Sequence, residues 1–264
     1  MPLLGRRGES KTEKAIITVA GKGGVGKTSI SAAIVRQLVK SYPEARILAI
    51  DADPAVGLAT ALDIQVGQTV DDIRKLITEA GEGDREKKRA KELLGEVRFR
   101  IFEAMTEKDG FAFIAVGRPE AAGCYCSINA YLKEVISMLS QEFDFVVIDG
   151  EAGIEQVNRR VMEKVTHLLL VTDPSKKGTG VIQTIKKVAD ELIMYKEIGA
   201  VVNRFNDQSV KEYIQTGDIP ILAYIPDDPQ LAMADVRGDS IMGLPDSSNL
   251  VKGVETALKT IGII

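Results

Sequence analysis

A glycine-rich segment near the N-terminus constrains the fold more than any other part of the sequence. Gly21-Lys22-Gly23-Gly24-Val25-Gly26-Lys27-Thr28 fits the pattern G-x-x-x-x-G-K-[ST] and lies between an apolar run at 15–20 and a helical pattern at 28–40. In this context the glycines let backbone N–H groups surround phosphate oxygens, and the helix start adds the positive end of its dipole. The sequence therefore predicts a phosphate-binding loop at 21–28, extended by Ser29, in which Lys27 reaches the β- and γ-phosphates and Thr28 binds Mg²⁺.

The same alternation of strand and helix patterns continues along the chain. Apolar, β-branched runs predict further strands at 46–50, 111–116, 143–148, 167–171, 198–202 and 221–225, and the pattern at 178–194 predicts a helix between two of them. Because these runs are apolar throughout, the strands should be buried on both faces, as in a parallel sheet. We expect an α/β fold with a single doubly wound, mostly parallel sheet and helices on both faces, formed by 15–264 after a flexible polar leader at 1–14.

Residues 67–100 interrupt this alternation. They are rich in charge and have helical patterns, as in GEGDREKKRAKELLGE. A pair of solvated surface helices is one interpretation, since a run of charge typically covers a solvated face. The other is a charged helical insertion that acts as a lid or docks a partner, with Gly81 and Gly83 as hinges, and the sequence leaves both open.

Composition excludes several classes of protein. With 45% hydrophobic and 27% charged residues the chain is globular, and its formal net charge of −4 disfavours a general nucleic-acid binder. No apolar run approaches the roughly 18 residues of a membrane span, and the first residues lack the apolar core of a secretory signal, so we expect a cytoplasmic protein that binds neither membrane nor nucleic acid. Two cysteines are too few for a disulfide scaffold, and the single histidine, His167, argues against a histidine-rich metal site or a Ser-His-Asp triad.

Acidic residues follow two of the predicted strands. Asp51-Ala52-Asp53-Pro54 follows the run at 46–50, and Asp149-Gly150-Glu151-Ala152-Gly153 follows FVVI. A carboxylate at the carboxyl end of a strand is well placed to bind a water of Mg²⁺, which prefers oxygen ligands and keeps its waters. Each aspartate on its own also suits a helix cap.

Lys22 adds a second lysine directly after the first glycine of the loop. This arrangement resembles the deviant Walker A motif of the ATPases related to MinD, ParA and the nitrogenase iron protein, and the likeness covers the chain from Lys14 onward. The resemblance implies that Lys22 crosses a dimer interface to the nucleotide of the partner. It also implies that 51–54 is switch I, with Asp51 on Mg²⁺ through water and Asp53 orienting the attacking water, and that 149–153 is Walker B plus switch II, with Asp149 near Mg²⁺.

Base recognition follows from the same resemblance. Asn203-Arg204 matches the family's Asn-Arg/Lys contact with adenine, and Pro226-Asp227-Asp228 matches its Pro-x-Asp loop near the base and ribose. The guanine-reading pattern Asn-Lys-x-Asp is absent, because Asn203-Arg204-Phe205-Asn206 ends in asparagine. We therefore expect ATP and ADP as the nucleotides.

The two cysteines of the chain lie one residue apart in Gly123-Cys124-Tyr125-Cys126. Residues i and i+2 of an extended backbone face the same way, so two thiolates could bind one soft metal ion, although they complete only half of a tetrahedral or square-planar site. A twofold dimer would supply the other half, because a symmetric interface presents the same patch twice. The alternative is a pair of buried or incidental cysteines without a ligand.

The residues around this pair carry a second resemblance. Gly117-Arg118-Pro119-Glu120 and Asn129, together with Glu151-Ala152-Gly153-Ile154-Glu155, are similar to the CooC family of nickel-handling ATPases. The resemblance implies a homodimer in which Cys124 and Cys126 of both subunits bind one metal ion, Ni²⁺ or Zn²⁺. It also implies a client apo metalloenzyme such as carbon monoxide dehydrogenase. The charged insertion and the leader do not match that family, so the client enzyme is left open.

Two other functions stay open. An electron donor like the nitrogenase iron protein has its two cysteines in separate segments, one of them just after switch II, whereas 149–160 contains no cysteine. A cluster bound by the C-x-C pair alone is still open. A partition or positioning ATPase would bind DNA or membrane, but the apolar stripe of Leu250, Val254, Leu258 and Ile261 is typical of a core-packing helix face.

Overall fold

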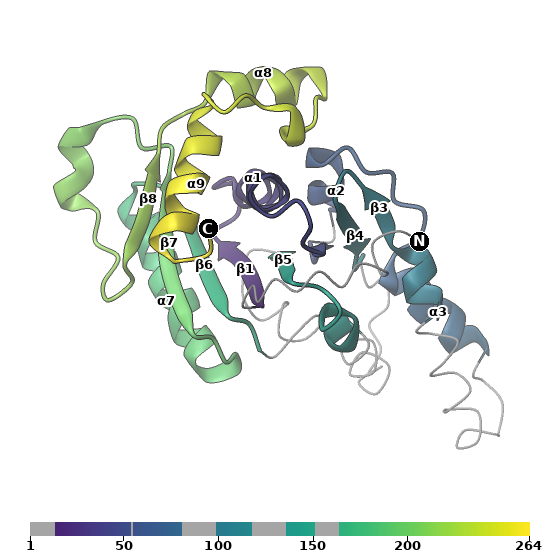
Figure 1. The fold of residues 1–264 in the computed structure, drawn as a ribbon. Helices are drawn as coiled ribbons and strands as arrows, with labels where there is room; N and C mark the ends of the chain where they lie inside the picture. The colour runs from purple at the N-terminus through teal and green to yellow at the C-terminus, as the bar shows by residue number, and fades with distance from the viewer. Residues whose placement is uncertain (1–13, 54, 81–98, 118–135, 151–163) are drawn as a thin grey trace.

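Eight strands form one sheet in the part of the chain that the computed structural model describes, namely residues 14–53, 55–80, 99–117, 136–150 and 164–264 (Figure 1). Their order across the sheet is β3-β4-β2-β5-β1-β6-β7-β8. The first strand of the described residues, β1, thus lies near the middle, between β5 and β6. The strands are β1 (Ala15–Gly21), β2 (Ile47–Asp51), β3 (Thr106–Lys108), β4 (Phe111–Ala115), β5 (Phe145–Asp149), β6 (His167–Thr172), β7 (Glu197–Asn203) and β8 (Ile221–Ile225).

This sheet confirms the predicted fold class. All strand pairings are parallel except that of β3 with β4. Each apolar run of the sequence forms a strand whose ends lie within two residues of the predicted ones. β3 was not predicted, because Thr106-Glu107-Lys108 is polar and becomes a strand only through its antiparallel pairing with β4.

Helices cover both faces of the sheet, as Figure 1 shows. On one face lie α1 (Lys27–Ser41), α2 (Gly57–Ala61) and α9 (Asn249–Thr260), with α8 (Pro229–Arg237) outside them. On the other face lie α3 (Val70–Ala80) and α7 (Lys176–Leu192), and the short 3₁₀ helices η1 (Gln208–Tyr213) and η2 (Ile241–Gly243) belong to connections. A separate apolar cluster fills the space between the sheet and each helical layer, as in a doubly wound fold.

The apolar stripe of α9 belongs to this core. Leu250, Val254 and Leu258 are at most 1% exposed and lie in the same cluster as Ile30 and Ile34 of α1. Their interpretation as a core-packing face is therefore confirmed. Among the helices that the structure describes, none combines the length and the apolar character needed to cross a membrane.

The start of the charged region at 67–100 differs from the prediction of solvated surface helices. Val70 and Ile73 of α3 are buried in the core beside the sheet. Asp71 and Arg74 of the same turn are buried as well. Their charges are paired, since Arg74 Nε donates to Asp71 Oδ1 at 2.7 Å. The first turns of α3 therefore belong to the helical layer. Residues 81–98, including the predicted hinge glycines, lie outside the described residues.

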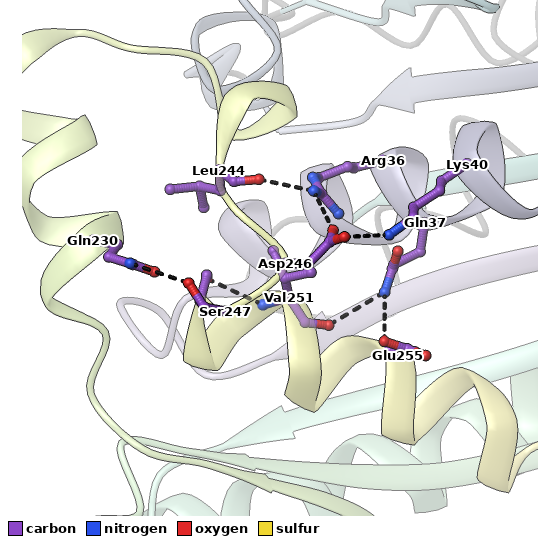
Figure 2. Close-up of polar contacts among 10 residues, drawn as sticks. Arg36, Gln37, Lys40, Gln230, Leu244, Asp246, Ser247, Val251 and Glu255 are labelled. Atoms are coloured by element: carbon purple, nitrogen blue, oxygen red, sulfur yellow. Dashed lines mark hydrogen bonds and ion pairs between the residues drawn. The ribbon is translucent and has the colours of Figure 1, made fainter.

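Polar contacts hold α1, the helix that begins at the phosphate loop, to the C-terminal part of the chain (Figure 2). Arg36 Nη2 donates to Leu244 O and to Asp246 Oδ1, each at 2.8 Å, and Lys40 Nζ donates to Asp246 Oδ2 at 2.6 Å. The hydrogen bonds from Lys40 and Arg36 lower the pKa of Asp246 to about 2. These contacts join α1 to the C-terminal part of the chain, in addition to the packing of its buried apolar residues in the core.

Candidate nucleotide site

The phosphate loop joins the end of β1 to the start of α1. Gly26 lies at this helix start with a φ of +93°, and no side chain caps the helix there. By contrast, the side chains of Ser175, Asp228 and Ser248 cap α7, α8 and α9. A Cβ at Gly26 would lie 2.5 Å from Asn203 Nδ2, so the position requires glycine. The N–H groups and dipole of α1 are therefore presented without a protein cap, as an anion site needs.

Lys27 lies against this loop. Its side chain is largely buried, with the residue 8% exposed, and its Nζ donates to Lys22 O at 3.3 Å. Burial of an ammonium group is costly unless its charge is compensated. A bound phosphate would supply that compensation, which agrees with the role predicted for Lys27.

Asn203, at the end of β7, supports the phosphate loop from the side. Its Nδ2 donates to Val25 O at 2.8 Å, a contact that was not predicted. Arg204 follows with an exposed side chain and a φ of +59°, which is uncommon for a residue other than glycine. The fold thus brings Asn203 to the phosphate loop, and the contact of Asn203-Arg204 with adenine stays a prediction.

Pro226-Asp227-Asp228 follows β8 and is joined to the loop after β7. Asp227 Oδ2 accepts from Asn206 Nδ2 at 2.7 Å, and Asp227 N donates to Asn206 Oδ1 at 2.8 Å. Asp228 uses both side-chain oxygens elsewhere: Oδ1 accepts from backbone N–H groups at the start of α8, and Oδ2 accepts from the Ser248 hydroxyl. Asp228 is thus a helix cap in this conformation, and the nucleotide contacts of this loop stay predictions.

Two buried carboxylates lie on adjacent strands at the carboxyl end of the sheet. Asp51 of β2 and Asp149 of β5 are register partners and are 0% and 1% exposed. Asp51 Oδ1 accepts from Asp53 N at 3.1 Å, and its Oδ2 accepts from Leu58 N at 2.9 Å at the start of α2. Burial, reinforced by the nearby charge of Asp149, raises the pKa of Asp51 to about 7.

Asp149 has the surroundings expected of a magnesium site. Its Oδ1 accepts from Ser31 Oγ at 2.8 Å, whereas its buried Oδ2 has no hydrogen-bond partner among the residues that the structure describes. Burial raises its pKa to about 6, against the lowering effect of the Thr28 and Ser31 hydroxyls and of the Lys27 charge. A water bound to Mg²⁺ would donate to the unpaired oxygen and favour the ionised carboxylate. The residues present therefore fit the ion.

Ser31 was missed by the sequence analysis, although a signal exists. It lies three residues after Thr28, so the two hydroxyls share one face of α1. Asp53 lies beside these carboxylates, since its N–H donates to Asp51 Oδ1, and its charge contributes to raising the pKa of Asp149. Its Oδ1 accepts from Ala55 N at 2.8 Å, and its role in orienting the attacking water stays a prediction.

Lys22 has an intramolecular partner that the sequence analysis did not identify. Its Nζ lies 3.5 Å from Asp173 Oδ2, and the two side chains are 34% and 23% exposed. Burial raises the pKa of Asp173, but hydrogen bonds from Ser175 and the charge of Lys22 lower it further, so that the pKa lies below its ordinary value. The signal was available: Asp173 directly follows the β6 strand, at a position like those of Asp51 and Asp149.

The predicted soft-metal site lies outside the described residues. Cys124 and Cys126 fall in 118–135, and the predicted switch II residues after Gly150 fall in 151–163. Within the described ranges, no group of three or more His, Cys, Asp or Glu side chains is arranged to hold a metal ion. The cysteine site therefore stays a prediction.

Comparison with known proteins extends over almost the whole chain. The model of the CobQ/CobB/MinD/ParA nucleotide binding domain matches residues 16–241. An uncharacterized ATP-binding protein of Methanocaldococcus jannaschii is 35% identical over 250 residues, which cover 93% of this chain and 98% of the relative. The carbon monoxide dehydrogenase accessory protein CooC of Rhodospirillum rubrum is 29% identical over 242 residues, which cover 86% of this chain and 89% of CooC.

A solved structure agrees with the fold. The septum site-determining protein MinD of Pyrococcus horikoshii, in complex with Mg-ADP, superposes with a TM-score of 0.65 at 19% identity, over 93% of this chain and 95% of MinD. At that identity the likeness concerns the fold. The family match and the phosphate loop together give the conclusion: the chain belongs to the CobQ/CobB/MinD/ParA family of nucleotide-binding domains and is an ATPase.

Proposed function

We propose that this chain is a dimeric metallochaperone that hydrolyses MgATP, binds nickel through Cys124 and Cys126, and delivers it to an apo metalloenzyme such as carbon monoxide dehydrogenase. The observation that carries the proposal is the C-x-C pair, which contains both cysteines of the chain. The relative CooC, an accessory protein of carbon monoxide dehydrogenase, supports it by aligning with most of both chains. We also propose that 15–264 is one ATPase domain and 1–14 a leader.

The nucleotide reaction is assigned to the carboxyl end of the sheet. Loop N–H groups and Lys27 would bind the phosphates, and Asn203-Arg204 with Pro226-Asp227-Asp228 would contact adenosine. Thr28, Asp51 and Asp149 would hold Mg²⁺, whose chemistry when bound is to neutralise charge on the phosphate oxygens. Asp53 would orient the attacking water. The Oδ2 of Asp149, which has no partner within the described part of the chain, and the Mg-ADP of the MinD neighbour support this assignment.

In the proposed dimer, Lys22 replaces its contact with Asp173 by a contact with the nucleotide of the partner subunit. In the single chain its ammonium lies beside Asp173. In the ATP dimer it would leave Asp173 and contact the phosphates of the partner's nucleotide. Because the third phosphate adds charge, ATP should favour the dimer more than ADP does, and only such a difference in binding can shift the equilibrium.

The metal is a cargo held by four thiolates, two from each subunit. Thiolate ligands must be deprotonated, so the affinity should fall as the thiols protonate. An ion that binds only the assembled form also stabilises the dimer by mass action. Movements of switch I and switch II on hydrolysis would then release the ion to the client.

The test is an anaerobic titration with nickel and with zinc, in ADP and in ATP. The Cys124→Ser/Cys126→Ser variant should lose metal binding and metal-induced dimerisation while it keeps nucleotide binding. Asp53→Ala is the matched control, since it should lose hydrolysis and keep the metal. Unchanged nickel affinity in the double serine variant would contradict the proposal.

A positioning or partition ATPase is a second candidate, supported by the likeness to MinD. Co-sedimentation with lipid vesicles or with DNA in the presence of ATP would favour it. The apolar face of α9 is packed in the core, so it offers no free membrane anchor in this conformation.

An iron-protein-like electron donor would instead be brown, with visible absorbance, when isolated without oxygen.

A further inference from the structure

The two buried carboxylates and the phosphate loop divide the carboxyl end of the sheet into two sides. Asp51 and Asp149 end β2 and β5, which lie on one side of β1, whereas β6, β7 and β8 lie on its other side (Figure 1). A nucleotide with its phosphates in the loop after β1 and its Mg²⁺ at these carboxylates would extend its base toward β7 and β8. Asn203, at the end of β7, contacts the phosphate loop on this side, since its Nδ2 donates to Val25 O at 2.8 Å.

Arg204 follows Asn203 in a strained backbone conformation. Its φ of +59° lies in the left-handed region, which costs free energy in a residue with a side chain and persists only where the surroundings impose it. Asn203 on one side is held by the phosphate loop. Phe205 on the other side is 3% exposed, and its N–H donates to Ile225 O at 2.9 Å. A strained residue that is held on both sides at the edge of a ligand site indicates a conformation set in advance for binding.

Asn206 joins this segment to the loop after β8. Its Nδ2 donates to Asp227 Oδ2 at 2.7 Å, and Asp227 N donates to Asn206 Oδ1 at 2.8 Å. Both polar atoms of the Asn206 side chain are therefore bound to one residue, through its side chain and through its backbone. We call this pair of hydrogen bonds between Asn206 and Asp227 the amide–carboxylate bridge.

The loop after β8 is itself fixed to α9, a helix of the core. Asp227 O accepts from Asn249 Nδ2 at 2.7 Å, and Asp228 Oδ2 accepts from Leu250 N at 2.9 Å and from the Ser248 hydroxyl. Leu250 is 1% exposed and belongs to the apolar cluster that α9 shares with α1. The amide–carboxylate bridge thus connects the segment after β7 to a firmly packed part of the molecule.

We propose that Asn206 is a positioning residue of the base site: through its bridge to Asp227 it holds Arg204 in the left-handed conformation and so presets the surface that receives the nucleotide base. This inference deepens the proposed function and rests on its assignment of Asn203-Arg204 and 226–228 to adenosine. A preset loop raises affinity because it loses less conformational freedom when the ligand binds. The bridge should therefore add to the affinity for a nucleotide with a base and leave the affinity for the phosphates alone unchanged.

Asn206→Ala removes both hydrogen bonds of the bridge, and Asp207→Ala is its matched control. Asp207 adjoins Asn206 and also forms an exposed hydrogen bond, since its Oδ1 accepts from Ser209 N at 2.8 Å, but this bond caps η1 within the same loop. Asn206 and Asp207 are both exposed, so neither change opens a cavity in the core.

The exchange Asn206→Asp/Asp227→Asn is the conservative rescue. A carboxylate at 206 still accepts from the N–H of residue 227, and an amide at 227 donates to that carboxylate, so both hydrogen bonds re-form with the side-chain donor and acceptor reversed. Asn206→Asp alone instead places two carboxylates against each other, and their like charges repel. A role that depends on the bridge requires a loss in the single variant and recovery in the exchange variant.

Calorimetry with MgATP and with inorganic tripolyphosphate in the same Mg²⁺ buffer separates the base from the phosphates. Asn206→Ala and Asn206→Asp should each weaken ATP binding roughly fivefold or more, the scale of one lost hydrogen bond, and keep the wild-type affinity for tripolyphosphate. Asp207→Ala and the exchange variant should bind both ligands with wild-type affinity. In hydrolysis assays Asn206→Ala should raise KM and keep kcat, because the base is bound equally in the ground state and the transition state.

The inference is overturned if Asn206→Ala keeps the wild-type affinity for ATP, if it weakens ATP and tripolyphosphate by the same factor, or if the exchange variant binds ATP as weakly as Asn206→Asp does. With a wild-type protein that binds ATP more tightly than tripolyphosphate, these results leave the proposed adenosine contacts in place. Equal wild-type affinities for ATP and tripolyphosphate would instead remove the adenosine contacts from the proposed function, and this inference with them.

Discussion

Replacing Asp173 by asparagine should strengthen the ATP-dependent dimer. Asp173 Oδ1 accepts from Ser175 N and from the Ser175 hydroxyl, whereas Oδ2 faces Lys22 Nζ at 3.5 Å. Asparagine can keep the first set of contacts and removes only the charge that holds Lys22. The lysine would then be released for the partner's nucleotide without a change in the start of α7.

The magnitude follows from the exposure of the pair. The Lys22 and Asp173 side chains are 34% and 23% exposed, and a partly exposed ion pair of this kind contributes roughly 0.5–1 kcal/mol. Each subunit breaks one such pair when the dimer forms, so its removal should favour the dimer by about 1–2 kcal/mol, which is roughly 5- to 30-fold in the dissociation constant. High salt should narrow the difference, because it weakens the pair in the wild-type protein.

Sedimentation velocity in ADP and in a non-hydrolysable ATP analogue measures the effect. Lys22→Ala and the double variant Lys22→Ala/Asp173→Asn complete a cycle, and Asp173→Asn should have no effect once Lys22 is absent. A dimer of Asp173→Asn that is no tighter than wild type, or an equal gain in the Lys22→Ala background, would refute the partner exchange.

Four further predictions concern the nucleotide site. Lys27→Ala should weaken ATP binding by about tenfold or more, the scale of a lost charge-assisted contact, and equal affinity in calorimetry would contradict its role. Asp53→Ala should bind ATP but hydrolyse it at least about 10²-fold more slowly, and phosphate release at the wild-type rate would remove the water-orienting role. Asn203→Ala should lose about 1 kcal/mol of stability by freeing the phosphate loop, seen as a lower urea midpoint. The folded-state pKa values of Asp51 and Asp149 are raised to about 7 and about 6, so the stability that these groups contribute is present below pH 4 and is lost as the pH rises toward 7. The urea midpoint of the metal-free protein should therefore fall over this pH range, and it should fall less steeply in Asp51→Asn. A pH dependence that this substitution leaves unchanged would contradict the assignment.

Local patterns were sufficient to predict the sheet. Each buried strand is a run of apolar residues long enough to be recognised on its own, and the glycine-rich loop fixes where the first strand ends. β3 could not be found in this way, because its residues are polar and its conformation depends on the neighbouring strand. The same limit hid the buried ion pair of Asp71 and Arg74, which in the sequence resembles any other part of a charged helix.

The sequence indicated candidate residues for the nucleotide site, but it did not indicate the hydrogen bonds that they form in the folded chain. Asp51 and Asp149 were both predicted near one Mg²⁺, and they are register partners on adjacent parallel strands. Which atoms they bond cannot be read from spacing. Asn203 also bonds the phosphate loop and Asp228 also caps α8, contacts that were not foreseen, while their predicted contacts with the nucleotide stay predictions. Such polar side chains have several partners within reach, and only the packed backbone selects among them.

In the proposed dimer, one metal ion is shared between the cysteine pairs of two subunits. Native mass spectrometry of a mixture of wild-type chains and mass-tagged Cys124→Ser/Cys126→Ser chains, loaded with limiting nickel in the presence of ATP, tests it most directly. The wild-type dimer should hold one ion, and the mixed dimer and the serine dimer should hold none at the same free nickel concentration. Wild-type dimers with two ions and mixed dimers with one would show that each subunit binds metal alone, and an ion retained by the serine dimer would place the site elsewhere.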